Sequence, residues 1–148
     1  MKQLRITILI AGLLLMCICV SQAQQKKQVH HTGQSLAAAM ARGQAVYTQV
    51  CLPCHMADGG GVQNMNPPLV GTTYVLGNKA ALIKIVLHGF NEDVEINGQT
   101  YSNTMGAHDD LTDRQIADVL TYVRHSFGNK ASIVNAADVS KVRAASKK

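Results

Sequence analysis

Two cysteines and a histidine stand together in the pattern C-x-x-C-H at Cys51, Cys54 and His55 of this 148-residue chain. Thiols at this spacing can form a disulfide or redox-active pair, supply half of a zinc site, or bond to a haem whose iron the adjacent histidine ligates. The redox alternative favours a βαβ context, but the residues before Cys51 have a helical pattern. The zinc alternative needs a second ligand pair, and the other cysteines, Cys17 and Cys19, lie in the N-terminal segment. The pattern therefore indicates one covalently bound c-type haem.

The N-terminal segment has the features of an export signal. Basic residues precede a largely apolar run of fifteen at residues 6–20, and small residues occupy Ser21 and Ala23, where a signal peptidase would cut. We expect residues 1–23 to be a cleaved signal peptide that removes the first two cysteines, and the mature protein to be periplasmic or otherwise exported. If the segment is not cleaved, it is long enough to act as a membrane anchor.

Composition limits the function classes. A chain of 148 residues with two Phe and no Trp has room for one modest domain, which excludes a multidomain enzyme. The formal charge of +5 hides an asymmetry, because residues 32–127 hold five basic and eight acidic residues, whereas residues 128–148 hold five basic and one acidic. Nucleic-acid binding has no support beyond this basic tail, and no catalytic constellation accompanies the haem motif.

The rest of the pattern predicts helices and one hairpin. Residues 24–34 are polar and are predicted to form a flexible arm. Residues 56–74 are predicted to form a loop, and Asn97-Gly98 is typical of a type I′ turn between strands at 94–96 and 99–101. Helices are predicted at residues 35–50, at 79–88 after an Asn78 cap, at 113–127 after a Thr112/Gln115 capping box and with Gly128 as its stop, and at 136–144 after an Asn135 cap.

Several of these features resemble the class I mono-haem cytochromes c. The run from Gly43 through Tyr47 into the C-x-x-C-H motif is similar to the N-terminal helix of that family, residues 66–71 resemble its proline-containing loop, and a single Met precedes a C-terminal helix that contains Tyr122. The resemblance covers about residues 35–128. It implies an all-α cytochrome c fold, with three to five helices around a covalent haem and one small β-hairpin, in which Gly43 and Tyr47 meet Leu120 and Tyr122. Residues 129–148 would form a basic extension with a short helix.

The haem-binding residues follow from the motif and the resemblance. Cys51 and Cys54 are expected to anchor the haem, and His55 to be the proximal iron ligand. The resemblance implies that the backbone carbonyl of Pro67 accepts the hydrogen bond of the His55 ring. Tyr101 is expected to be a further haem-binding residue.

The sixth ligand is expected to be Met105, which lies in a loop between the hairpin and the last helix of the family region. A thioether ligand raises the reduction potential of haem iron relative to harder ligands. Gly106 follows where the family typically has Pro, which suggests a less rigid loop. Met65, or His88 or His108 in a bis-His centre, are the alternatives.

The sequence thus predicts an exported electron carrier that is not itself an enzyme, acting as a diffusible carrier or as the cytochrome subunit of a dehydrogenase or oxidase. The alternative is a haem-based sensor or enzyme with a labile sixth ligand. Acidic residues on both sides of Met105 favour basic protein redox partners; they are Glu92, Asp93, Glu95, Asp109, Asp110 and Asp113.

Overall fold

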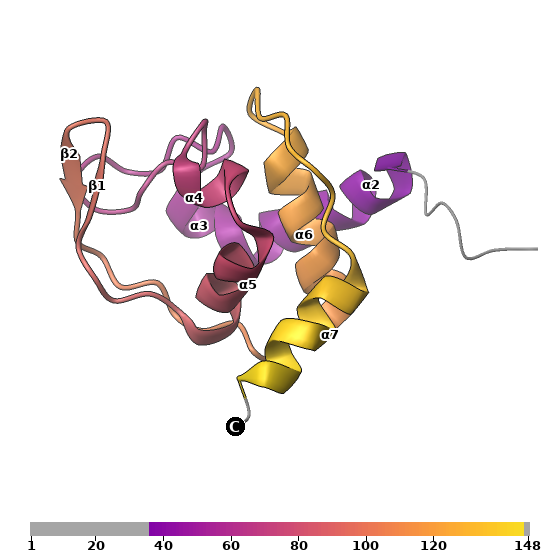
Figure 1. The fold of residues 1–148 in the computed structure, drawn as a ribbon. Helices are drawn as coiled ribbons and strands as arrows, with labels where there is room; N and C mark the ends of the chain where they lie inside the picture. The colour runs from indigo at the N-terminus through magenta and orange to yellow at the C-terminus, as the bar shows by residue number, and fades with distance from the viewer. Residues whose placement is uncertain (1–35, 147–148) are drawn as a thin grey trace, which may run out of the picture. The chain divides into compact units, whose positions relative to one another are not determined.

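The computed structural model describes residues 36–146, so the predicted signal peptide and flexible arm lie outside the described residues. Helices dominate, with one two-stranded antiparallel sheet, which confirms the predicted fold class (Figure 1). No helix in this part of the chain is long and apolar enough to cross a membrane. In chain order the elements are α2 (Leu36–Val46), a π-helical segment η2 (Tyr47–Cys51), α3 (Leu52–His55), α4 (Thr73–Leu76), α5 (Lys79–His88), β1 (Val94–Ile96), β2 (Gln99–Tyr101), α6 (Asp113–His125) and α7 (Ala136–Ala145).

The first helix does not run regularly into the C-x-x-C-H motif. It changes to the wider π geometry at Tyr47 and resumes as α3, which carries Cys54 and His55. Pro53 stands in the first turn of α3 and explains the restart, because proline cannot donate to the carbonyl four residues earlier and its ring would clash with it. The prediction of one regular helix to residue 50 was wrong in this detail.

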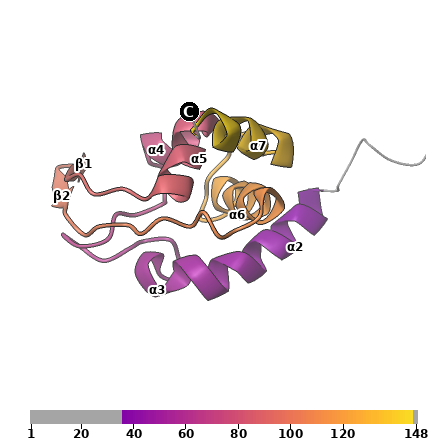
Figure 2. The same cartoon turned by 90° about the horizontal axis from the view of Figure 1, so that it is seen from below.

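Helices α2 and α6 cross at close range (Figure 2). Gly43 is buried at the crossing, and a Cβ atom added there would lie 2.7 Å from the Tyr122 Cβ and would also overlap the backbone of Asp118. The ring of Tyr47 lies 5.4 Å from that of Tyr122, between centroids. The predicted contact with Tyr122 is confirmed, although the neighbours nearest to Gly43 are Asp118 and Tyr122 and not Leu120. The crossing thus fixes the position of α2, which continues through η2 into α3.

Helix α6 begins where the capping box predicted but ends earlier than expected. The Thr112 side chain accepts from the Gln115 backbone at 3.2 Å, and the Gln115 side chain accepts from the Thr112 backbone at 2.9 Å. The helix stops at His125, so the prediction that Phe127 lies on it was wrong. Phe127 has a φ of +58° and packs its ring against Tyr47, at 5.4 Å between centroids. The aromatic contact thus coincides with the point where the chain leaves the helix.

The predicted N-cap of α5 and the predicted hairpin turn are confirmed. The Asn78 side chain accepts from Ala80 N at 2.8 Å, and α5 ends at His88, followed by Gly89 with a φ of +77°. Asn97 and Gly98 have φ values of +54° and +75°, as a type I′ turn requires. The short helix α4 was not predicted and lies within and just beyond the expected loop 56–74.

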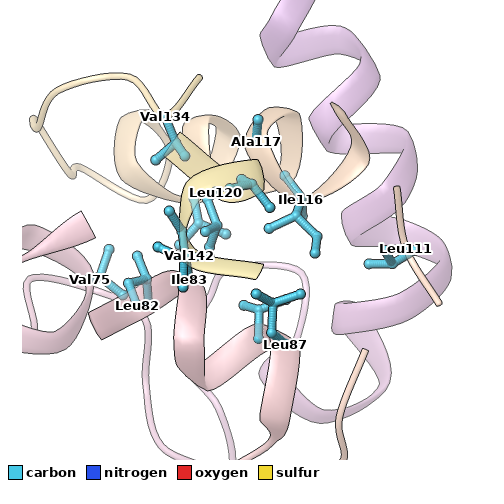
Figure 3. Packing of buried hydrophobic residues seen from close by; sticks show 14 of the residues in the cluster. Val75, Leu82, Ile83, Leu87, Leu111, Ile116, Ala117, Leu120, Val134 and Val142 are labelled. Carbon is cyan, nitrogen blue, oxygen red and sulfur yellow. The ribbon is translucent and has the colours of Figure 1, made fainter. Parts of the chain in front are cut away.

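The C-terminal helix α7 packs against both α5 and α6. It was predicted at 136–144 and is found one residue longer. Its Val139 and Val142 are buried in the core with Ile83 and Leu120, which Figure 3 shows gathered in one cluster with Val142. The described part of the C-terminal extension is therefore integrated with the remainder of the fold and does not trail from it.

Candidate functional site

A cavity of about 250 Å³ opens between α3, α5, α6 and the hairpin. All six residues predicted from the sequence to bind the haem or its iron line it. They come from η2 and α3, from the loop after α3, from β2 and from the loop before α6; they are Cys51, Cys54, His55, Pro67, Tyr101 and Met105. Residues separated in sequence by up to about half of the described chain thus line the same cavity.

Cys51 is half-buried and Cys54 is exposed, and no disulfide joins them. Burial, with a smaller contribution from Cys54, raises the pKa of the Cys51 thiol to about 11. A redox-active dithiol needs a lowered pKa, because the thiolate is the reactive form. The environment of Cys51 raises the thiol pKa where a redox-active dithiol needs it lowered, so it does not favour the thioredoxin-like alternative.

The His55 ring is oriented by one hydrogen bond, from Nδ1 to the backbone oxygen of Pro67 at 3.0 Å. This is the bond that the resemblance implied. Donation from Nδ1 leaves Nε2 with its lone pair, the form that binds a metal. Burial lowers the pKa of His55, opposed by the Pro67 hydrogen bond, so the ring is neutral at pH 7. A neutral imidazole is the protonation state an iron ligand needs.

The loop that supplies this carbonyl is itself fixed by backbone hydrogen bonds. Leu69 N donates to Gly59 O at 2.7 Å, and Gly61 N donates to His55 O at 3.2 Å. Gly61 has a φ of +67°, and a Cβ atom there would lie 2.7 Å from the Pro67 oxygen. Glycine at this position is required both by the backbone angle and by the close approach to the oxygen that holds His55.

Met105 is held at the cavity by its backbone. Its N–H donates to Phe90 O at 2.8 Å and its oxygen accepts from Phe90 N at 3.0 Å, a pair of bonds that joins the loop before α6 to the end of α5. The side chain is half-buried and lines the cavity. Of the alternative ligands, Met65 and His88 are exposed and lie outside the lining, whereas His108 is half-buried and belongs to it.

Tyr101 lies on β2 and is buried, and its hydroxyl donates to Gln99 Oε1 at 3.0 Å.

The apolar residues of the cavity wall could not be identified from the sequence, because hydrophobic periodicity marks buried positions without separating core residues from cavity-lining ones. Phe90 and Tyr74, whose rings meet edge to face at 6.2 Å, had no signal beyond being aromatic. The missed lining residues include Leu82, Val86, Val94, Leu120 and Val123.

This donor set fits a haem. Two thiols are available for bonding, one imidazole nitrogen is free for iron, a thioether lines the same cavity, and most of the remaining lining is apolar, as a porphyrin plane requires. Among residues 36–146 no group of three or more His, Cys, Asp or Glu side chains could hold a metal ion. The zinc alternative therefore finds no partner ligands in this part of the chain.

Comparison with known proteins gives one consistent family. The family model described as Cytochrome c matches residues 40–127, more than half of the chain. The cytochrome c subunit of a quinone-dependent alcohol dehydrogenase from Gluconacetobacter polyoxogenes is 39% identical over 103 residues, which are 68% of this chain and 22% of that subunit. Cytochrome c-552 of Thermus thermophilus is 31% identical over 118 residues, covering 74% of this chain and 79% of the relative.

The fructose dehydrogenase cytochrome subunit of Gluconobacter japonicus is 37% identical over 110 residues, covering 71% of this chain and 22% of the subunit. The chain thus spans about a fifth of the length of these dehydrogenase subunits and most of the length of the Thermus protein. The family match begins inside α2 and ends at Phe127. The chain therefore belongs to the cytochrome c family and carries a covalently bound haem c.

Proposed function

We propose that Cys51 and Cys54 form the thioether bonds to the haem, and that His55 and Met105 are the two iron ligands. The observation that carries this assignment is the hydrogen bond from His55 Nδ1 to Pro67 O, made on the wall of a cavity that all these side chains share. In this assignment Tyr101 contacts the haem from β2. The haem, when bound, supplies an iron that accepts and releases one electron.

The protein's own residues set how that electron is exchanged. The Pro67 carbonyl holds the His55 ring in one tautomer, and the Phe90 backbone holds the Met105 segment. With both ligand positions filled, small molecules have no access to the iron, so electron transfer is favoured over ligand chemistry. Cys54 is exposed, so this side of the site is within reach of a protein partner.

The function is tested on protein made with a cytochrome c maturation system. One haem per chain, a reversible one-electron titration and a ferrous form that does not bind carbon monoxide are expected. Ready binding of carbon monoxide by the unmodified protein would contradict the assignment, because a haem sensor or enzyme with an open sixth position behaves in this way. The measurement thus separates the two functions directly.

We further propose that the chain acts outside the cytoplasm, with residues 1–23 as its export signal or, if uncleaved, its membrane anchor. Residues 24–34 would then link the signal to the cytochrome domain at 35–128. Protein redox partners of the dehydrogenase, oxidase or reductase class are supported by the dehydrogenase subunits among its relatives. The chain would serve either as a diffusible carrier or as the cytochrome part of such a complex.

The charge around the site favours a basic partner. Glu92, Asp93 and Glu95 are exposed, and Glu92 lines the cavity mouth. Electron transfer to a positively charged protein is expected to slow about tenfold as salt rises from low to physiological strength. Replacing the three acids by Gln, Asn and Gln should lower the low-salt rate and flatten this dependence in stopped-flow measurements. An acidic probe protein is the control, and its rate should rise with salt; identical salt dependence for the two probes would contradict the proposal.

A further inference from the structure

The C-terminal helix contacts the segment that leads from Met105 into α6. Arg143 of α7 makes three hydrogen bonds there: Nε donates to Asp113 Oδ1 at 2.8 Å, Nη1 to Asp109 O at 2.8 Å and Nη2 to Leu111 O at 2.6 Å. Two of the acceptors are backbone carbonyls, so the guanidinium fixes the course of the chain as well as one side chain. Arg143 lies beyond residues 40–127, so this contact comes from outside the matched family region.

The segment between Met105 and Leu111 has other restraints along its first half. It is bonded to Phe90 at its start, and His108 N donates to Val86 O at 2.9 Å near its middle. A Cβ atom added to Gly106 would meet nothing within 4 Å, so a side chain at this position would have no neighbour, although the backbone of residues 105–107 lies close to Gly89. At the C-terminal end of the segment, Leu111 is buried in the core, and Arg143 donates to the Asp109 and Leu111 carbonyls. Its charged donors make stronger hydrogen bonds than neutral ones.

We propose that Arg143 is a positioning residue for the sixth iron ligand, holding the Met105 segment over the cavity so that the sulfur stays bound. This inference rests on the proposed ligation by Met105. It also gives a reason why Gly106 need not make the loop labile: the rigidity is supplied from α7.

A purely structural role for Arg143 would act through the docking of α7 as a whole. The helix has a second polar anchor, because Lys79 of α5 pairs with Asp138 at 3.1 Å and donates to Ile133 O at 3.3 Å. That anchor contacts α5 and does not touch the Met105 segment. Lys79→Met is therefore the matched control for Arg143→Met, since each removes one charged anchor of α7 and keeps an unbranched apolar side chain.

The experiment uses the haem-loaded protein and two readouts. The first is the affinity of ferric protein for added imidazole, which must displace the methionine sulfur. Arg143→Met should bind imidazole about tenfold more tightly, which is the effect of losing one charge-assisted hydrogen bond that favours the methionine-bound form. The affinity of Arg143→Lys should be intermediate, and that of Lys79→Met should be unchanged. The second is amide hydrogen exchange, which should accelerate at Met105 and His108 in Arg143→Met and not in Lys79→Met.

Each outcome decides the inference. Equal changes in the two Met variants, or no change in either readout, overturn it, as does faster exchange with unchanged imidazole affinity, because Arg143 would then hold the loop without influencing the iron. A wrong assignment of Met105 as ligand would have a different signature, because the unmodified ferric protein would lack the sulfur-to-iron charge-transfer band at the red end of the spectrum. If the band is present but neither readout changes in Arg143→Met, ligation by Met105 is retained and only the positioning role of Arg143 is wrong.

Discussion

The Cys51→Ala/Cys54→Ala double variant is expected to be colourless after denaturing electrophoresis and haem staining, whereas the unmodified protein stains. Denaturation removes a haem held only by ligands, so the stain reports the thioether bonds alone. Each single variant keeps one thiol and should stain more weakly. Gln49→Ala is the control, because Gln49 is exposed and lies two residues before Cys51.

The same double variant should also be less stable, because the cavity would lack the haem that fills it. Leaving about 250 Å³ of apolar space unfilled costs up to about 6 kcal/mol at about 24 cal/mol per Å³. This cost is comparable with the free energy of unfolding of a typical domain, which is roughly 5–15 kcal/mol. Denaturant unfolding followed by circular dichroism should show an early, shallow transition. A double variant that stains, or a native-like transition without haem, would contradict the assignment of the two cysteines.

Local chemistry explains which parts of the fold could be predicted from the sequence. The Thr112/Gln115 capping box, the Asn78 cap and the Asn97-Gly98 turn each depend on hydrogen bonds or backbone angles within a few residues. These elements were found at the predicted places. The C-x-x-C-H motif is local in the same sense, since the spacing of the residues alone implies the chemistry.

Features set by distant contacts could not be predicted. Phe127 continues the apolar period of α6, but the aromatic contact with Tyr47, eighty residues earlier, coincides with its departure from the helix. The depth of α7 in the core depends on α5 and α6, and its own pattern resembles a short surface helix. The anchoring role inferred for Arg143 was likewise invisible, because its three acceptors lie at residues 109–113.

In the candidate site, too, local chemistry could be predicted and distant contacts could not. Sequence could name four histidines and methionines as possible sixth ligands, and only the fold separates those at the cavity from those outside it. Met65 and His88 carry the same ligand chemistry as Met105 and His108. Their exposure is decided by the path of the loop after α3 and by the end of α5, which no local pattern encodes.

Met105→Ala is expected to remove the sulfur-to-iron charge-transfer band of the ferric protein and to let the ferrous protein bind carbon monoxide. Loss of a soft thioether ligand should lower the reduction potential by more than about 0.1 V, part of the roughly 0.8 V that axial ligands span. The backbone bonds to Phe90 do not depend on the side chain, so the fold around the site should persist. Visible spectra and a redox titration measure all three changes.

His108 affects the interpretation of this variant, because it also lines the cavity and its imidazole is a second candidate ligand for the iron. If His108 binds, Met105→Ala stays low-spin and takes up carbon monoxide slowly, and Met105→Ala/His108→Ala opens the site fully. Met65→Ala is the control and should match the unmodified protein, since Met65 is 49% exposed and outside the lining. A band that survives Met105→Ala and disappears in Met65→Ala would show that the sixth ligand comes from the loop after α3, and the roles assigned to Met105 and Arg143 would both be wrong.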